Sequence, residues 1–433
     1  MIYLCDSIMG SGKSTAAINY MNARPTEKFL YVTPMNDETW RIQRACPGLN
    51  FVVPSNAAEE HQHLKREHLR DLVASGRNVS MTHSLFSLCD DDVLEKMEGQ
   101  GYTLILDEAI SVLQNTQIKE HDLEIALRSD WLKCDTSNFE QPQHIQFTGD
   151  GYAGDWLKDI KFYAASHPLV MMPGSDAADS SKKKAKKSLY YWMLNDRLFS
   201  VMKDVYILTY LFDGSPLSYY FQARGISYEQ IGVILDDFGQ HQFSMTHYYI
   251  PAYVADLKNK IHILQNKRMN DIGRCETSLS ATKQTNMGSK GLSDYRCREL
   301  QANLCNFFNN IHRDKSKDQK MWTTYESLRR AVKGGGYTRL YQPFNLRATN
   351  DFRNVTVMAY CVNVYMHLSE KIYYESLGAT VNERTYALSV MLQWIWRSAI
   401  RDGKEIWIYI PSARMRKLLE DWIEEVSTLA SAA

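Results

Sequence analysis

The sequence begins with a short apolar run that leads into a glycine-rich turn and then into a helix-forming segment. Residues 2–15 read IYLCDSIMGSGKST, which predicts a strand over residues 2–5 and a helix over residues 14–20. Gly10 and Gly12 let the backbone curl until successive N–H groups point at one anion, and the helix N-terminus adds partial positive charge. A strand, a turn of this kind and a helix in this order predict a phosphate-binding loop in an α/β fold.

The side chains of this loop fit the chemistry of a bound nucleoside triphosphate. Lys13 can reach the β- and γ-phosphates, and Ser14 is placed to hold Mg²⁺. Position 7, where the usual G-x-x-x-x-G-K-[ST] pattern has glycine, is Ser7, but Gly10 and Gly12 are the glycines nearest the phosphates. The predicted nucleotide-binding residues are Gly10, Ser11, Gly12, Lys13, Ser14 and Thr15.

A second predicted strand ends in two adjacent acids. Residues 102–110 read YTLILDEAI, so Asp107 and Glu108 follow an apolar run, at the strand end where α/β proteins bind ligands. Asp107 can take part in the Mg²⁺ shell through water, and Glu108 can orient and activate an attacking water. A water-activating glutamate favours a hydrolase over a nucleotide kinase, whose acceptor is a hydroxyl or phosphate of its substrate.

The 433 residues suit two domains, and strands alternate with helices in both halves, as in a parallel sheet covered on both faces. The turn DGSP at residues 213–216 places the boundary so that one lobe covers residues 1–215 and the other 216–433. Further predicted strands are 29–32, 79–81, 104–106, 205–208, 261–264, 321–324, 339–341, 355–359 and 406–410. Further predicted helices are 63–73, 386–401 and 414–426.

Each predicted lobe carries an insertion, at about residues 111–200 and 265–315. The first contains DAADSSKKKAKK at residues 176–187, which is typical of a solvated loop, with a flexible contact to a phosphate backbone as the alternative. The second contains the polar residues 273–294, which predict a mobile loop.

Composition excludes several classes of protein. No apolar run is long enough to span a bilayer and no secretory signal is visible, so we expect no membrane partner and a cytoplasmic location, the host cytoplasm if the protein is viral. The 8 cysteines are scattered and form no CxxC pair, which disfavours a zinc site or a disulfide framework. Because the formal net charge is zero, any contact with nucleic acid must use a local groove.

Further short motifs follow the phosphate loop in a fixed order. They are YVTP at 31–34, MTHS at 81–84, DEAI at 107–110, LTYLF at 208–212, MWTTY at 321–325, NLRATND at 345–351 and QWIWRSAIR at 393–401. Their order resembles that of motifs Ia to VI of superfamily 2 helicases, the DEAD/DEAH-like group. The later blocks are similar to helicase-like proteins of tailed bacteriophages. The resemblance covers nearly the whole chain apart from the two insertions.

This resemblance implies two RecA-like lobes with ATP in the cleft between them and arginine fingers from the second lobe. Arg397 matches the first arginine of Q-x-x-G-R-x-x-R, while Trp396 replaces the glycine and the last arginine comes one place late, at Arg401. On the predicted helix, Gln393, Arg397 and Arg401 would share a face. Two arginines there could neutralise charge as the γ-phosphate leaves. The predicted catalytic residues are Lys13, Glu108, Gln393, Arg397 and Arg401.

The resemblance also implies a nucleic-acid track across both lobes, where small hydroxyls and backbone donors grip phosphates without reading sequence. The candidate contacts are Thr33, Thr82, His83, Thr323, Arg347 and Thr349. The motif is DEAI and not DEAD, and no adenine-reading segment precedes the phosphate loop in this sequence. These departures disfavour a strict DEAD-box RNA unwinder, and DNA is favoured over RNA as the track, with the choice between them left open by the sequence.

Together these patterns predict an ATP-dependent, Mg²⁺-dependent helicase or translocase that acts on DNA in phage replication or recombination, alongside other replication proteins. One alternative is a DNA-packaging-type or other ATPase motor without strand separation, although the acids of the C-terminal half are too scattered for a nuclease site. Another is a non-catalytic nucleic-acid clamp, which the intact Lys13, Asp107 and Glu108 disfavour.

Overall fold

The computed structural model describes residues 1–56, 65–115, 125–126, 128–134, 142–149, 167–172, 189–195, 197–246, 249–345 and 352–432. The chain divides into two compact units. Unit 1 comprises Met1–Ser7, Gly12–Tyr248 and Met366–Val381, and unit 2 comprises Ile8–Ser11, Tyr249–Tyr365 and Asn382–Ala433. Each unit is built on its own parallel sheet, which confirms the predicted α/β fold class.

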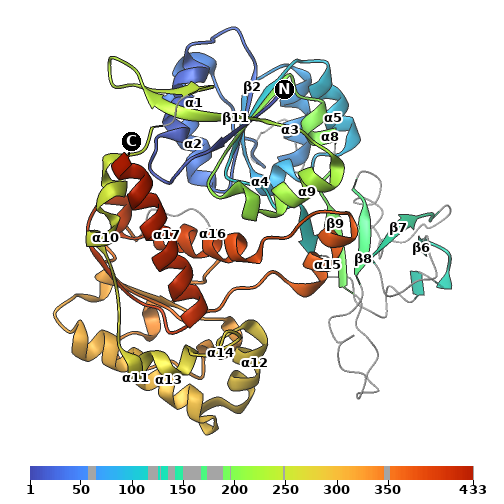
Figure 1. The fold of residues 1–433 in the computed structure, drawn as a ribbon. Helices are drawn as coiled ribbons and strands as arrows, with labels where there is room; N and C mark the ends of the chain where they lie inside the picture. Colours follow the sequence, from blue (N-terminus) through green and yellow to red (C-terminus); the bar gives the residue numbers. More distant parts are fainter. Residues whose placement is uncertain are drawn as a thin grey trace. The chain divides into compact units, whose positions relative to one another are not determined.

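A sheet forms the centre of unit 1 (Figure 1). It has seven strands in the order β12-β11-β1-β10-β4-β2-β3. Its strands are β1 (Ile2–Asp6), β2 (Phe29–Thr33), β3 (Val79–Thr82), β4 (Thr103–Asp107), β10 (Asp204–Thr209), β11 (Glu229–Leu235) and β12 (His241–Ser244). Neighbouring strands are parallel except in the β11–β12 hairpin. All five strands predicted for the first half are confirmed.

Helices connect these strands and cover the sheet. They are α1 (Lys13–Asn22), α2 (Asn36–Ala45), α3 (Lys65–Ala74), α4 (His83–Phe86), α5 (Asp91–Glu98), α8 (Arg197–Ser200), α9 (Pro216–Arg224) and α15 (Leu368–Ser376). The small residues Ala16 and Ala17 of α1 are fully buried in one core with Phe29 and Tyr31 of β2. Because these side chains are short, α1 can lie close to the sheet and hold the end of the glycine-rich turn in a fixed place.

Unit 1 extends beyond the predicted boundary at residue 215. The turn is present as a short 3-10 helix (Phe212–Gly214), but α9, β11 and β12 follow it in the same unit. The outer edge of β1 pairs with β11, and α15 also returns to unit 1, where the rings of Tyr219 and Tyr374 lie 5.6 Å apart. A turn signal is local, so it could not tell which sheet the next strand would join.

A separate antiparallel sheet falls inside the segment predicted as an insertion at residues 111–200. Its order is β5-β9-β8-β7-β6. The strands are β5 (Leu113–Asn115), β6 (Leu132–Cys134), β7 (Gln143–Phe147), β8 (Leu169–Met172) and β9 (Leu189–Met193). The lysine run at residues 176–187 lies outside the described residues.

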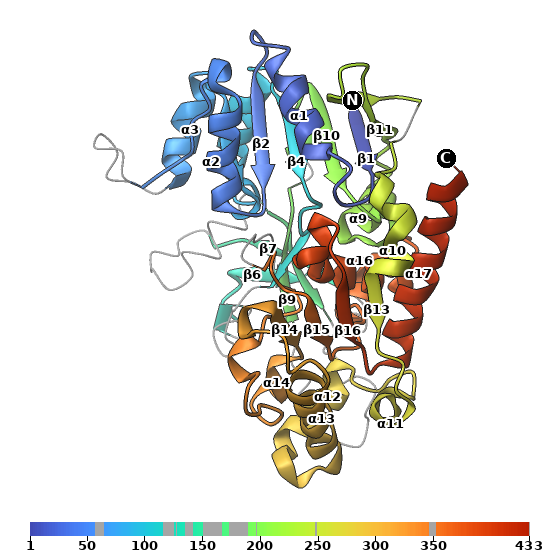
Figure 2. The ribbon, with the colours of Figure 1, turned by 90° about the vertical axis from the view of Figure 1, so that its left-hand side faces the viewer.

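Unit 2 contains a parallel sheet of four strands in the order β13-β16-β15-β14 (Figure 2). The strands are β13 (Ile261–Ile263), β14 (Lys320–Thr323), β15 (Val357–Tyr360) and β16 (Ile406–Tyr409). The strand predicted at residues 339–341 is wrong, because a 3-10 turn (Thr338–Leu340) occupies that place. Only Tyr341 makes a single bridge to Trp322, and its ring lies 5.3 Å from the indole.

The helices of unit 2 include one in a segment predicted to be a mobile loop. They are α10 (Leu257–Lys260), α11 (Lys267–Asn270), α12 (Ala281–Lys290), α13 (Tyr295–Cys305), α14 (Glu326–Arg329), α16 (Glu383–Ile395) and α17 (Ala413–Ala432). The prediction of a mobile loop at residues 273–294 is wrong, since α12 occupies part of this segment. Its polar composition was misleading because the helix buries only a narrow face. Gln284 and Met287 form that face, and a largely polar sequence is enough to build it. Across the described ranges, no helix has both the length and the apolar character needed to cross a bilayer.

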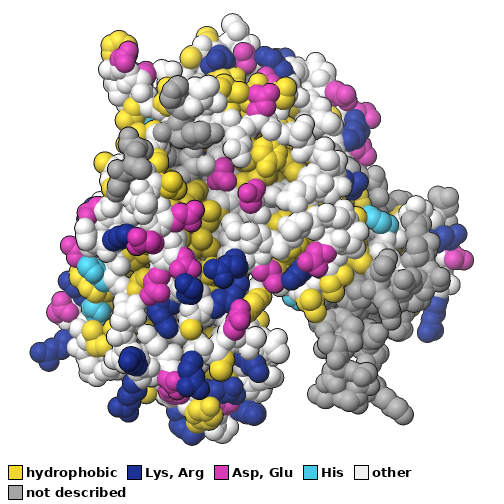
Figure 3. Space-filling view, in the orientation of Figure 1, with side chains coloured by type: hydrophobic (Ala, Val, Ile, Leu, Met, Phe, Trp, Pro, Cys, Tyr) yellow, Lys and Arg dark blue, Asp and Glu magenta, His cyan; other side chains and the backbone are white. Residues whose placement is uncertain are grey.

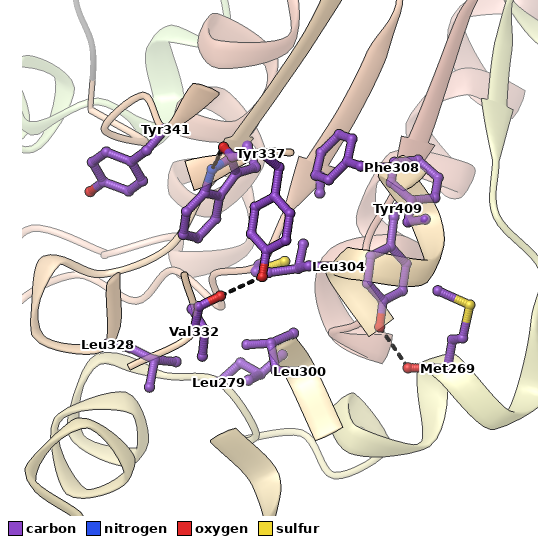
Figure 4. Close-up of a cluster of buried hydrophobic side chains, with 14 of the residues drawn as sticks. Met269, Leu279, Leu300, Leu304, Phe308, Leu328, Val332, Tyr337, Tyr341 and Tyr409 are labelled. Carbon is purple, nitrogen blue, oxygen red and sulfur yellow. Dashed lines mark hydrogen bonds between the residues drawn. The ribbon is translucent and has the colours of Figure 1, made fainter. Parts of the chain in front are cut away.

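A core of buried aromatic and aliphatic side chains fixes α11–α14 onto the sheet of unit 2 (Figure 4). The Trp322 indole N–H donates to the Tyr337 carbonyl at 2.9 Å, and the Tyr409 hydroxyl donates to the Met269 carbonyl at 2.6 Å. Buried aromatic side chains with satisfied polar atoms contribute their full apolar area without an unpaired donor. These helices are therefore an integral part of unit 2.

Candidate nucleotide-binding site

The glycine-rich turn between β1 and α1 has the backbone of a phosphate-binding loop. Gly10 and Gly12 adopt φ values of 79° and 86°, in the left-handed region that favours glycine. Gly12 is the N-cap of α1, and no side chain caps the helix. The hydroxyl of Ser11 is buried and has no hydrogen-bond partner among the described residues. Uncapped N–H groups and a buried, unpaired hydroxyl fit an anion at this helix N-terminus.

Lys13 is held at the start of the same loop. Its ammonium donates to the carbonyl of Ser7. Burial lowers the pKa of Lys13, while the neighbouring Cys5, Asp107 and Asp6 act in the opposite direction. A phosphate oxygen bound in the loop would therefore compete with one backbone carbonyl for this ammonium.

Asp107 lies beside the first turn of α1, although β10 separates β4 from β1 in the sheet. The Ser14 hydroxyl is 3.3 Å from each carboxylate oxygen of Asp107. Adjacent ligands of an octahedral Mg²⁺ lie about 3 Å apart, given bonds of about 2.1 Å. The spacing of these oxygens fits a shared Mg²⁺ site with Ser14 and Asp107 as the residues that would hold the ion.

Two further residues fix the position of Asp107. The Tyr31 hydroxyl donates to Asp107 Oδ2 at 2.8 Å, and a ring nitrogen of His83 lies 2.8 Å from the Asp107 carbonyl oxygen. Burial and the adjacent charge of Glu108 raise the pKa of Asp107 to about 6, against the hydrogen bond from Tyr31. A carboxylate that is costly to ionise in such surroundings would be stabilised by a divalent cation.

Glu108 follows Asp107 with an unusual backbone. Its φ is 65°, in the left-handed region, which costs a non-glycine residue about 1 kcal/mol or more. The Glu108 N–H donates to the Leu208 carbonyl of β10 at 2.9 Å, and this bond holds the turn against the sheet. The second acid is therefore placed by a fixed turn at the carboxyl end of β4.

Sequence reasoning missed two residues of this site, Tyr31 and His241. Tyr31 lies two positions before the predicted contact Thr33, on the same face of β2, and could have been found only with β2 and β4 known as neighbours. His241 comes from the β11–β12 hairpin, and a Cβ placed on Gly12 would lie 1.9 Å from its Cδ2 atom. No local signal connects residues so far apart in sequence.

The predicted nucleic-acid residues of unit 1 lie at the carboxyl ends of β2 and β3. Thr33 is buried, and its hydroxyl has no partner within the described part of the chain. Thr82 instead caps α4, because its hydroxyl accepts from the Leu85 N–H at 3.3 Å. His83 is buried and supports Asp107. Contact with nucleic acid stays a prediction for all three.

The remaining predicted contacts belong to unit 2. Thr323 ends β14 and is fully buried, with a hydroxyl that lacks a partner in the described ranges. Arg347 and Thr349 lie outside the described residues. Their roles stay predictions.

The helix predicted to carry the arginine fingers ends earlier than expected. Helix α16 stops at Ile395, Ser398 is extended, and a 3-10 turn covers Ala399–Asp402. The argument that Gln393, Arg397 and Arg401 share one helical face is therefore wrong. The indoles at positions 394 and 396 are buried and Arg397 is only 7% exposed, whereas Gln393 and Arg401 are exposed. The catalytic roles of these three residues stay predictions.

Comparisons with known proteins agree with the parallel sheet of unit 2. Residues 255–423 match the family described as the YonV C-terminal Rossmann-like domain. The SPbeta prophage-derived uncharacterized protein YonV of Bacillus subtilis (strain 168) is 34% identical over 432 residues, which cover 98% of each chain. Among solved structures, an XPD helicase has a TM-score of 0.43 at 11% identity, covering 97% of this chain and 94% of its own. S. tokodaii Xpd4 has a TM-score of 0.41 at 12% identity, covering 98% and 94%.

Proposed function

The chain belongs to the family of the prophage protein YonV, and we propose that it is an ATP-hydrolysing motor that acts on nucleic acid as a helicase or translocase. One observation carries this proposal. In unit 1 the Ser14 hydroxyl, at the start of α1, lies 3.3 Å from both carboxylate oxygens of Asp107, at the end of β4. A glycine-rich loop with Lys13 precedes the first residue, and Glu108 follows the second.

Each of these groups has a distinct task in phosphate hydrolysis. The loop N–H groups and Lys13 hold the phosphates, and Lys13 exchanges the Ser7 carbonyl for phosphate oxygens. Ser14 and Asp107 would hold Mg²⁺, which would neutralise phosphate charge. Glu108 orients the attacking water and accepts its proton. Arg397 and Arg401 are the candidates to neutralise charge on the departing phosphate.

The proposal of a nucleic-acid motor is supported by more than the nucleotide site. The ordered motifs of both halves support movement on nucleic acid, and the prophage origin of the relative supports DNA in phage replication or recombination as the setting. The alternative hypotheses are a motor without strand separation and a non-catalytic nucleic-acid clamp. They differ in whether ATP is hydrolysed and whether strands part.

The first experiment is ATP hydrolysis by the purified protein, alone and with single-stranded DNA, duplex DNA or RNA. Lys13→Ala tests the phosphate loop, Glu108→Gln tests the water-orienting role, and Lys404→Ala is a matched control at an exposed lysine. We expect one nucleic acid to stimulate hydrolysis, both site variants to lose it by at least about a hundredfold, and Lys404→Ala to behave as wild type.

The same experiment separates the competing readings. Hydrolysis indifferent to all three nucleic acids would reject the motor and leave another kind of ATPase. Nucleotide binding without hydrolysis would favour the clamp. Wild-type rates in Lys13→Ala or Glu108→Gln would refute the roles given to these residues. A strand-displacement assay then distinguishes a helicase from a translocase.

A further inference from the structure

The helical part of unit 2 concentrates positive charge in a chain whose formal net charge is zero. Residues 265–341 contain 15 of the 50 Lys and Arg but only 7 of the 50 Asp and Glu, so this segment carries +8 and the rest of the chain −8. The excess is local, and neither the total charge nor the motifs reveal it. Figure 3 shows many of these cations on the face over α11–α14.

Most of these cations are exposed and unpaired. Arg296 and Arg329 form ion pairs with Asp294 and Glu326, at 2.9 Å and 3.3 Å. Within the described residues, a larger set is exposed and forms no ion pair: Lys267, Arg268, Lys283, Lys290, Arg330, Lys333 and Arg339. A cation without an ion pair can bind an anion from solution directly, whereas a paired cation must first break its ion pair with a carboxylate.

The elements that carry Lys283, Lys290 and Arg330 pack directly on one another. A Cβ at Gly288 of α12 would lie 2.0 Å from the carbonyl oxygen of Ser327 in α14, so the two helices approach as closely as glycine allows. The Thr285 and Ser327 hydroxyls lie 3.3 Å apart across the same contact.

The turn after α14 is tied to α13 in turn. The Gln301 side chain donates to the Lys333 carbonyl at 2.6 Å. Below these elements lies the aromatic core of Figure 4. The cations therefore project from a rigid base, which we call the α12–α14 platform (residues 281–339).

We propose that the α12–α14 platform binds the phosphate backbone of nucleic acid. This inference rests on the proposed function, which supplies a reason for the chain to meet a polyanion. Lysines and arginines spread over several packed elements match a row of regularly spaced phosphates, which need charge and not a shaped pocket. The contact is independent of base sequence and adds to the contacts predicted at the strand ends.

The test measures equilibrium binding of a labelled single strand and of the matching duplex, without nucleotide, over a range of salt concentrations. The test variant is Lys283→Ala/Lys290→Ala/Arg330→Ala. The matched control, Arg44→Ala/Arg77→Ala/Lys404→Ala, also removes three exposed cations that form no ion pair in the described residues. Thermal denaturation and ATP hydrolysis without nucleic acid are measured for all three proteins to show that the fold and the nucleotide site are intact.

We expect the platform variant to bind at least about tenfold more weakly and to lose about two to three units of the slope of log K against log salt, since each phosphate contact contributes about 0.9. The control should keep both the affinity and the slope. Equal binding by the platform variant and the wild type, or an equal loss in the control, would overturn the proposal. Binding of labelled poly-glutamate is measured in parallel, and if the platform variant lost that binding while it retained DNA binding, the surface would belong to an acidic protein and the proposal would be overturned.

Failure of the proposed function is distinguishable from failure of this inference. A chain that binds DNA through the platform but never hydrolyses ATP would refute the motor and keep the platform. A chain whose hydrolysis is stimulated by DNA equally in the platform variant and the wild type, with unchanged affinity, would do the opposite.

Discussion

At the scale of single residues, Asp107 connects the stability of the chain with its chemistry. Ser14, Tyr31 and His83 fix its position, while burial and Glu108 make its ionised form costly. A carboxyl with a pKa of about 6 is mostly ionised at neutral pH, and its buried charge lowers the stability of the metal-free protein. Under the proposed function, a cation bound by Ser14 and Asp107 would offset this cost.

We expect Asp107→Asn to stabilise the metal-free protein while abolishing hydrolysis. The pKa of Asp107 is raised in the folded state to about 6, so this carboxyl favours folding at low pH, and that contribution is lost as the pH rises through about 6. At pH about 7.5, with a chelator present, asparagine removes the half-buried charge of Asp107, and we expect a gain in stability of about 1 kcal/mol. At pH about 3 the carboxyl is protonated in both the folded and the unfolded chain, and the gain should vanish. Thermal denaturation at both pH values checks this, and an equal loss of stability at both would contradict it.

At the scale of elements, α12 shows how packing overrides composition. Its sequence is polar and contains glycine, yet Gln284 is fully buried and bonded to the carbonyl oxygens of Leu279 and Cys361, at 3.0 Å and 2.6 Å. Gly288 allows the helix to touch α14. The helix forms because neighbouring elements satisfy its few buried positions, while its exposed face remains free to carry lysines.

We expect Gly288→Ala to destabilise the protein, although alanine is the better helix former by about 1 kcal/mol. The added Cβ would meet the Ser327 backbone carbonyl, which cannot move away without shifting α14, and such overpacking costs about 1–3 kcal/mol. Thr282→Ala, at an exposed position of the same helix, is the control and should be neutral or slightly stabilising. Chemical denaturation gives the free energy of unfolding of both variants and the wild type. A Gly288→Ala protein more stable than the wild type would show that α12 does not pack as described.

At the scale of the whole molecule, each unit is assembled from separate stretches of the chain. Unit 1 takes Met366–Val381 back from the C-terminal half, where Tyr373 and Tyr374 are almost fully buried and the Thr380 N–H donates to Gln222 Oε1 at 3.1 Å. The chain therefore passes between the units more than once. Neither unit can be cut out as one continuous fragment.

We expect fragments to reveal this arrangement. A fragment of residues 1–215 lacks β11 and β12, so β1 becomes an unpaired sheet edge, and it should aggregate. A fragment of residues 1–246 restores that edge and should be more soluble, although it still lacks α15. Adding residues 366–381 through a flexible linker should raise its thermal stability further. Sedimentation and thermal denaturation of the three fragments provide the measurement, and equal behaviour of the first two would contradict the assigned pairing of β1 with β11.

The sequence by itself determined the local parts of this protein. The glycine-rich turn, the acid pair after β4 and most strands of the two parallel sheets were predictable, because glycine conformation, strand burial and charge at a strand end depend on a few consecutive residues. Side chains that meet across the fold were not predictable in this way. Tyr31 reaches Asp107 only because β2 neighbours β4, and His241 reaches Gly12 only through the β11–β12 hairpin.

Tertiary structure alone decided the end of α16, the formation of α12 and the division between the units. Each of these features depends on the elements that pack against the segment, and not on the segment's own sequence. Helix α16 ends at Ile395 before Arg397 and Arg401, α14 gives α12 a surface to pack on, and β11 pairs with the edge of β1 after the turn at Phe212–Gly214. The free energy that fixes these features comes from contacts between distant residues, so no window of the sequence contains it.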